Sequence, residues 1–249
     1  MQMEWVDDAI ILSAQRHGER GVIVNALTRS HGRHSGLVRY GASRQLRGVL
    51  EPGNEINVRW RARLSEHLGN YSVEPVRARA AAVMRDPLRL AGLTSACAVA
   101  QQVLPEREPH GPVFDGMRAM LDAIENIEMW PAALVRWELG VLEELGFGLD
   151  LSKCAATGAI DDLVYVSPRT GRAVSRLPGL PYHERLMPLP GFLLGAQMQG
   201  RPADILAGLD LTGFFLARHA LEPHGKPMPA ARSRLCERLK IWCEEAVLG

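Results

Sequence analysis

The first 80 residues alternate between short apolar stretches and turn signals, a pattern that predicts β structure. Apolar stretches occupy residues 9–12, 21–27, 36–40, 55–64 and 70–76. Segments typical of turns separate them, among them Ser30-His31-Gly32 and Glu51-Pro52-Gly53-Asn54. About five short strands with turns at this spacing are typical of a small barrel or sandwich.

The segment from Glu55 to Leu64 alternates most clearly. Every second position is apolar: Ile56, Val58, Trp60, Ala62 and Leu64. The positions between them carry Arg59, Arg61 and Arg63. Because successive side chains of a strand point to opposite faces, the apolar set should face a core and the three arginines should lie outside it.

After residue 80 the apolar period changes from two to about 3.6, which predicts helices. Three stripes mark the first helices: Leu90, Leu93, Cys97, Ala100 and Leu104; Phe114, Met117, Leu121 and Ile124; Leu134, Trp137, Val141 and Leu145. Residues 146–190 are rich in turn formers, with one strand-like piece at 163–166. Further helices are expected over 202–208, 210–221 and 229–247, so we predict a domain boundary near residue 80.

Composition narrows the class of protein. The chain is 47% hydrophobic and 23% charged, values typical of a globular protein. No apolar run reaches the ~18–20 residues that a membrane span needs, and the acidic start MQMEWVDDAI is unlike a signal peptide. The four cysteines are too few and too widely spaced for a disulfide framework. We therefore expect a soluble, cytoplasmic protein.

Charge is distributed unevenly along the chain. Residues 1–80 hold 12 arginines and no lysine against 8 acidic residues, whereas residues 81–249 hold 17 basic and 20 acidic residues. Arginine presents a planar fork of donors that suits phosphate oxygens, so the first part is a candidate for binding a polyanion. The candidate nucleic-acid-binding residues are Arg29, Arg33, Arg39, Arg44, Arg47, Arg59, Arg61 and Arg63. Tyr40 and Tyr71 are candidate stacking surfaces for bases, and a merely solvated polar face stays open as the alternative.

The sequence contains no complete motif for a metal site or for catalysis. Cys154 lies in a turn-like segment where zinc ribbons place a Cys-x-x-Cys pair, but the second position is Thr157 and the next cysteine is Cys236. The chain contains no phosphate-binding loop, no Gly-x-Ser-x-Gly elbow and no His-Glu-x-x-His helix. Asp161-Asp162 and His183-Glu184 are isolated pairs. We expect no enzyme activity, no catalytic residue, no metal and no cofactor.

Two long segments resemble the RecO family of DNA repair and recombination mediators. The first runs from Gly21-Val22-Ile23-Val24 through Thr28-Arg29-Ser30-His31-Gly32-Arg33 to Leu50-Glu51-Pro52-Gly53. The second joins Leu145-Gly146-Phe147-Gly148-Leu149-Asp150-Leu151 with Tyr165-Val166-Ser167-Pro168-Arg169-Thr170-Gly171-Arg172. The order and spacing of these matches make the combination more specific than any one of them.

The resemblance implies an α+β protein with several domains. Residues 1–80 would form an oligonucleotide-binding (OB) fold β-barrel, and residues 81–249 a mainly α-helical domain with a small zinc-finger-like insertion at about 150–190. In metal-bearing members four cysteines hold zinc. Here Thr157, Ser175 and Pro178 stand at or near the other ligand positions, so the insertion lacks the cysteine set and zinc binding is not carried over.

The resemblance also implies a non-enzymatic function. The protein would bind single- and double-stranded DNA without sequence specificity and anneal complementary strands. With RecR it would help load RecA onto DNA coated by single-stranded DNA-binding protein, whose acidic C-terminal tail would dock on the helical part. Arg136, Arg218, Arg232 and Arg234 are available there.

Two other functions stay open at this point. One is an RNA-binding or ribosome-associated OB-fold protein, because a basic barrel does not by itself distinguish DNA from RNA. The other is a metal-dependent nuclease that would use Asp161 and Asp162.

Overall fold

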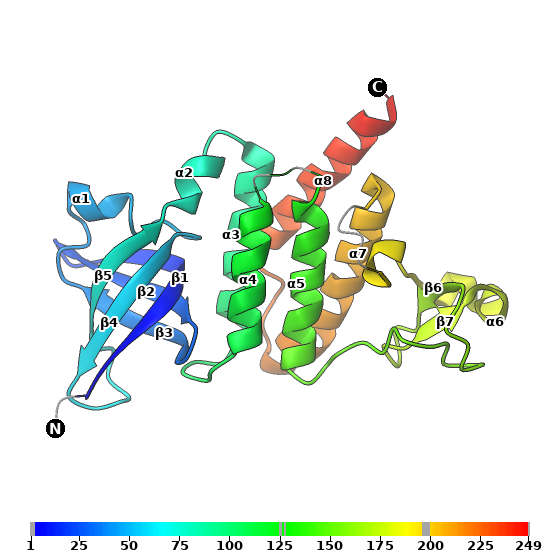
Figure 1. Cartoon of the computed structure of the whole chain (residues 1–249), viewed down its shortest axis with the longest axis horizontal. Coiled ribbons are helices and arrows are strands. Elements are labelled where there is room, and N and C mark those ends of the chain that lie inside the picture. Colours follow the sequence, from blue (N-terminus) through cyan, green and yellow to red (C-terminus); the bar gives the residue numbers. More distant parts are fainter. Residues whose placement is uncertain (1–2, 125, 127, 196–199, 249) are drawn as a thin grey trace. The chain divides into compact units, whose positions relative to one another are not determined.

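The computed structural model describes residues 3–124, 126, 128–195 and 200–248, and the chain divides into two compact units, Met1–Glu125 and Asn126–Gly249 (Figure 1). The strands are β1 (Met3–His17), β2 (Gly21–Thr28), β3 (Gly32–Val38), β4 (Glu55–Ala62), β5 (Asn70–Arg77), β6 (Leu163–Val166), β7 (Ala173–Ser175) and β8 (Met187–Pro188). The α-helices are α1 (Arg44–Arg47), α2 (Arg79–Val83), α3 (Pro87–Val103), α4 (Gly111–Ala123), α5 (Trp130–Glu144), α6 (Arg176–Gly179), α7 (Pro202–Phe215) and α8 (Ala230–Leu248). The fold class is α+β, with a β region first and helices after it.

The first five strands form a closed barrel in the order β1-β2-β3-β5-β4 (Figure 1). β1 is long because it pairs with two neighbours: its second half lies antiparallel to β2 and its first half antiparallel to β4. β3 and β5 complete the barrel through one parallel pair, Leu37 with Asn70. The prediction of about five strands in a barrel or sandwich is confirmed, and the structure selects the barrel.

The strand bounds differ from the predictions where the outward residues are polar. β1 begins at Met3 and ends at His17, whereas only residues 9–12 were expected, because the rest of the strand has no continuous apolar run. β3 covers Gly32–Val38 instead of 36–40 for the same reason, since Arg33 and Ser35 alternate with buried neighbours.

The barrel core contains the apolar face predicted for β4. Ile56, Val58, Trp60 and Ala62 are all buried, and Arg59 and Arg61 between them are exposed. Leu64, predicted for the same face, is 51% exposed because β4 ends two residues before it. The alternation therefore predicted the faces correctly and the strand end wrongly.

A buried histidine lies beside this core. His34 is 4% exposed, and its Nδ1 lies 3.2 Å from the Tyr71 hydroxyl. Burial, aided by the positive charge of Arg107, lowers the pKa of His34 to about 4. The unfolded chain, with an ordinary pKa near 6.5, takes up this proton more readily than the folded protein does.

Acidification should therefore destabilise the fold through His34. Stability from this residue is complete above about pH 6.5 and decreases as the pH falls toward 4, by roughly 3 kcal/mol in all. Denaturant unfolding at several pH values, together with an NMR titration of the His34 ring, measures this. The variant His34→Phe should have a flatter pH profile, and a ring that titrates near pH 6.5 in the folded protein would contradict the prediction.

The first compact unit extends past the barrel because helices pack on it. α3 contacts β1 and β2, and the Cys97 thiol on α3 lies 3.6 Å from the Ile11 carbonyl oxygen. Arg79 is buried and binds Glu55 of β4 at 2.5 Å and Asp122 of α4 at 2.8 Å. These contacts join strands and helices in one unit across the change of pattern at residue 80. The division into domains at that residue stays a prediction.

The second unit contains α5, α7 and α8, and α7 contacts both of the other helices. Near its centre, Arg232 of α8 binds Glu138 of α5 through two hydrogen bonds of 2.8 Å, and both side chains are buried. Thr212 of α7 donates a 2.5 Å hydrogen bond to the same carboxylate. The helices predicted over 202–208 and 210–221 are one continuous element, α7, followed by a π-helical segment Leu216–Leu221.

The loop-rich region expected at about 150–190 contains a three-stranded sheet in the order β7-β6-β8 and the short helix α6. The strand predicted at 163–166 coincides with β6. Cys154 is 1% exposed and makes turn hydrogen bonds: its N–H donates to the Ala159 carbonyl, and its sulfur accepts from the Ser175 N–H at 3.3 Å. Although burial alone would raise it, these and other hydrogen bonds lower the pKa of the thiol to about 6.

Within the described part of the chain, every helix is too short or too polar to cross a bilayer.

Candidate nucleic-acid interface

The eight predicted arginines lie in different surroundings on the first unit. Arg29 forms an ion pair of 3.0 Å with Asp115 of α4. Arg33 is 13% exposed, donates from Nε to the Leu104 carbonyl oxygen and binds Glu106 at 3.0 Å. Both side chains thus tie the barrel to the helices of the same unit. The structure does not bring them together with Arg39, which lies beyond the opposite end of β3.

Arg59 and Arg61 share one partner. Both are about half exposed on β4, and both bind Glu4 of the neighbouring strand β1 at 2.8 Å. The hydrogen bond from Arg61, followed by that from Arg59, lowers the pKa of the Glu4 carboxyl. One carboxylate therefore offsets part of the positive charge that the sequence pattern assigns to this face.

The other four predicted arginines are without an acidic partner among the described residues. Ser43 caps the single turn of α1, accepting a hydrogen bond of 3.4 Å from the Leu46 N–H, and Arg44 and Arg47 project from this turn into solvent. Within the described ranges, Arg39, Arg44, Arg47 and Arg63 form no ion pair. These four keep their full charge available for an anionic ligand.

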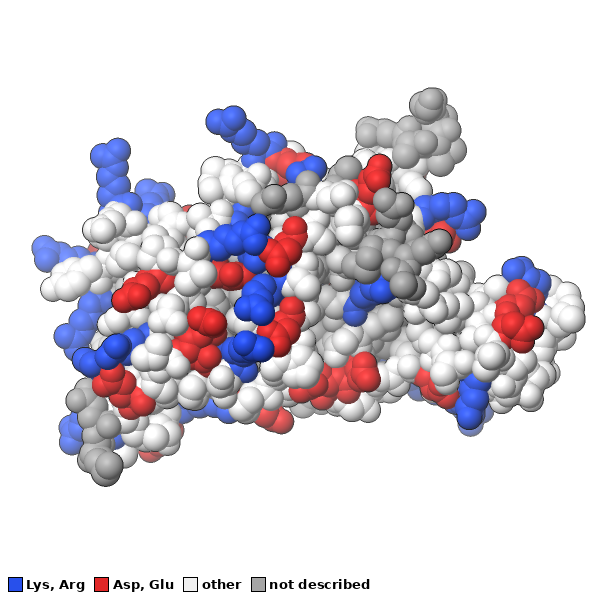
Figure 2. All heavy atoms as spheres, in the orientation of Figure 1, with Lys and Arg blue, Asp and Glu red and all other residues white. Residues whose placement is uncertain are grey.

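Two further arginines, absent from the sequence prediction, extend this surface. Arg16 is the last residue but one of β1, Arg20 directly precedes β2, and both are exposed. Arg16 and Arg47 line one hollow of about 170 Å³ together with Glu51, and the Arg20 carbonyl accepts a hydrogen bond from the Ala42 N–H at 3.2 Å. We call Arg16, Arg20, Arg44 and Arg47 the arginine edge. Figure 2 shows basic side chains projecting along this side of the barrel.

The positions of Arg16 and Arg20 on the barrel could have been predicted from the sequence. They flank the turn His17-Gly18-Glu19, whose Gly18 has a φ of +64°. A strand that runs into this turn places Arg16 and Arg20 at the same end of the barrel as α1. The expected strand ended at residue 12, and so they had no predicted position.

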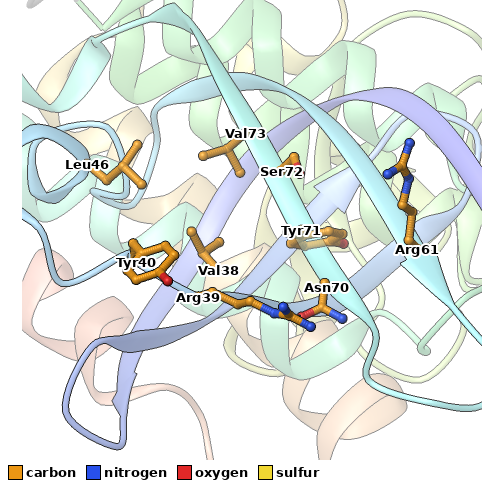
Figure 3. A pocket seen from close by; sticks show the side chains of 9 residues that line it. All are labelled: Val38, Arg39, Tyr40, Leu46, Arg61, Asn70, Tyr71, Ser72 and Val73. Carbon is orange, nitrogen blue, oxygen red and sulfur yellow. The ribbon is translucent and has the colours of Figure 1, made fainter.

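A larger hollow of about 490 Å³ lies between β3 and β5 (Figure 3). Val38, Tyr71 and Val73 supply apolar side chains, while Arg39, Arg61, Asn70 and Ser72 supply polar ones. Tyr40, at its rim, is 64% exposed. Tyr71 is 4% exposed, so its prediction as a stacking surface is wrong: Gly36 of β3 leaves room for the Tyr71 ring, which packs into the barrel.

The four arginines considered for a partner groove on the helical part have different surroundings. Arg232 is buried against Glu138 and is excluded from any surface groove. Arg136 donates to the Phe192 and Gly195 carbonyl oxygens, and Arg218 to the Pro168 carbonyl oxygen at 3.2 Å. Of this set, Arg218 and Arg234 are exposed.

Asp161 and Asp162, the candidate nuclease pair, have different surroundings. Asp162, with a φ of +48°, forms an ion pair of 3.2 Å with Arg176, and Asp161 is exposed. Among the residues that the structure describes, no three His, Cys, Asp or Glu side chains lie close enough to share a metal ion.

An arginine-rich edge beside an exposed tyrosine on a five-stranded barrel is a candidate surface for a nucleic acid. Comparison with known families narrows the class. The model for the N-terminal part of recombination protein O matches residues 1–79, and the model for its C-terminal part matches residues 84–227. The chain belongs to the recombination protein O (RecO) family.

Curated relatives agree over nearly the full length. The chain is 53% identical to DNA repair protein RecO of Rhodospirillum centenum over 96% of this chain and 95% of that protein. It is also 53% identical to DNA repair protein RecO of Phenylobacterium zucineum, over 95% of this chain and 98% of that protein. The corresponding protein of Rhodospirillum rubrum is 49% identical.

Proposed function

We propose that this protein is a non-enzymatic recombination mediator in DNA repair that acts in the bacterial cytoplasm and reaches the nucleoid when engaged. The observation that carries the proposal is the arginine edge: four exposed basic side chains that form no ion pair within the described ranges, on the barrel of a RecO family member. The name of the relatives, DNA repair protein RecO, supports a role in DNA repair.

The barrel would be an OB fold. Five strands, closed in the order β1-β2-β3-β5-β4, agree with the small Greek-key barrel that binds oligonucleotides across its strands and loops. The insertion between α5 and α7 would be the zinc-finger-like module of the family, held by turn hydrogen bonds at Cys154 in place of a full cysteine set.

The arginine edge explains how the protein would bind single- and double-stranded DNA. Each arginine that neutralises a phosphate releases condensed counterions, and phosphate contacts carry no sequence information. Binding is therefore independent of sequence. Annealing follows from the same chemistry: two strands repel each other until cations offset their charge, and no nucleotide hydrolysis or catalytic residue is required.

The helical unit would receive protein partners. An acidic C-terminal tail of single-stranded DNA-binding protein needs basic side chains, and Arg169, Arg185 and Arg234 are exposed on this unit. With RecR, the protein would help RecA load onto DNA that single-stranded DNA-binding protein has released. RecA itself would be reached indirectly.

Fluorescence anisotropy of a labelled single-stranded oligonucleotide, titrated at several salt concentrations, tests the proposal. We expect log affinity to fall linearly with log salt, with a slope near −0.7 for each phosphate contacted. Equal competition by unrelated DNA sequences is expected, and stronger competition by RNA of the same sequence would favour an RNA-binding function instead. No binding at low salt would overturn the proposal, whereas annealing of complementary strands would extend it.

A further inference from the structure

We propose that the hollow between β3 and β5 receives one unpaired nucleobase of a bound DNA strand, with Tyr40 as its stacking platform and Arg39 on the adjoining phosphate. This inference rests on the DNA-binding function proposed above and deepens it: it separates recognition of single strands from the general attraction of phosphates to the arginine edge.

The hollow exists because few backbone hydrogen bonds join β3 to β5. β3 and β5 pair through Leu37 and Asn70 alone, with one further hydrogen bond of 3.1 Å from the Leu37 N–H to the Gly69 carbonyl oxygen. Past this pair, β5 continues along β4 while β3 ends at Val38 and the chain turns into α1. Leu46 of α1 lines the far side of the opening.

The chemistry of the lining suits a base. Val73 is half-buried and presents apolar atoms to a flat ring, while the buried Val38 and Tyr71 side chains lie beneath the hollow. Asn70 and Ser72 place an amide and a hydroxyl at the rim, where the polar edge of a base would lie (Figure 3). The volume of about 490 Å³ falls within the range of pockets for small ligands.

Tyr40 is positioned to stack on a base, and Arg39 is positioned to bind the adjoining phosphate. Tyr40 is 64% exposed, so its ring has a free face that a base can cover. The Arg39 Nε donates to the Asn70 side-chain oxygen at 3.0 Å, which orients the guanidinium while leaving its outer nitrogens for a phosphate. Figure 3 shows Tyr40 and Arg61 on opposite sides of Tyr71, with Arg39 extending beside Asn70.

This arrangement selects unpaired bases. In a duplex each base is stacked and paired, so none reaches the hollow without the cost of unstacking. In a single strand this cost is smaller because no base pair is broken. Stacking on an aromatic side chain is tolerant of sequence because every base has a π-face. The arginine edge serves both forms of DNA, and the hollow adds affinity for the single strand alone.

The variant Tyr40→Ala tests the inference against three labelled ligands: a single-stranded oligonucleotide, the corresponding duplex, and an abasic strand with the same phosphates. We expect a loss of roughly 5- to 150-fold for the single strand and little change for the other two, with an unaltered salt slope. Tyr40→Phe should bind as the original protein does. Tyr182→Ala is the matched control, because Tyr182 is 59% exposed on the other unit.

The outcomes are distinct. Unchanged single-strand affinity in Tyr40→Ala, with normal binding by the original protein, would overturn this inference and leave the proposed function intact. An equal loss on all three ligands would also overturn it, because Tyr40 would then act on the surface as a whole. Absence of DNA binding by the original protein would overturn both proposals. Strong competition by free thymidine monophosphate would identify a mononucleotide site instead of a strand site.

Discussion

Replacing all four residues of the arginine edge, Arg16, Arg20, Arg44 and Arg47, by glutamine is expected to lower affinity for single-stranded DNA by a few hundredfold at 0.1 M salt. Each phosphate contact on a single strand releases about 0.7 counterion, which corresponds to roughly fivefold in affinity at this salt concentration, and four contacts multiply. The slope of log affinity against log salt should become shallower by about 3. Anisotropy titrations from 0.05 to about 0.5 M salt measure both quantities.

A variant with the same change in net charge is the control. Arg85, Arg169, Arg185 and Arg238 are exposed and lie outside the barrel. Their replacement by glutamine should alter affinity by no more than a few-fold, because none of them belongs to the arginine edge and a charge that contacts no phosphate releases no counterion. Equal losses in the two variants would show that binding depends on net charge and not on the arginine edge. All four edge residues are exposed, so circular dichroism should show an unchanged fold.

The second large effect is on stability, through the buried pair of Glu138 and Arg232. Glu138→Gln removes the carboxylate that Arg232 binds at 2.8 Å and leaves a buried guanidinium without its counter-charge. Loss of one partner of such a pair costs about 3–5 kcal/mol. Denaturant unfolding followed by circular dichroism should therefore show a lower free energy of unfolding with little change in the m-value.

Two comparisons make this result specific. Asp204→Asn removes the carboxylate of the pair with Arg201, whose side chain is 85% exposed, and should cost less than about 1 kcal/mol. Replacing Glu138 and Arg232 together by methionine should be less destabilising than Glu138→Gln, because no charge is then left buried. Equal destabilisation by the two single carboxylate-to-amide variants would contradict the role assigned to burial.

Local sequence patterns predicted those features that depend on residues close together in the chain, namely strand faces, helices and turns. The alternation at residues 55–64 placed Arg59 and Arg61 outside the barrel, and the apolar stripe that begins at Leu90 falls on α3, whose first turn is capped by the Asp86 carboxylate. The turn-forming stretch after residue 146 was expected and contains β6 at the predicted residues. Propensity and capping act within a turn or a strand, so one segment is enough to show them.

The candidate site was predictable only in part. Arginine content indicated the first unit, but the availability of each guanidinium depends on partners distant in sequence: Asp115 for Arg29, Glu106 for Arg33, Glu4 for Arg59 and Arg61. These ion pairs join residues 55 to 86 positions apart. No local pattern contains that information.

By itself the sequence determined the order of the five barrel strands and of the long helices, the excess of positive charge in the first 80 residues and the membership of the RecO family. The tertiary structure decided which charges remain free and where a ligand can enter. Barrel closure brings the turn before β2 beside α1, which creates the arginine edge, and packs Tyr71 inward while Tyr40 stays exposed. The physical reason is that ion pairing and burial depend on distances in space, which the chain sets only when it folds.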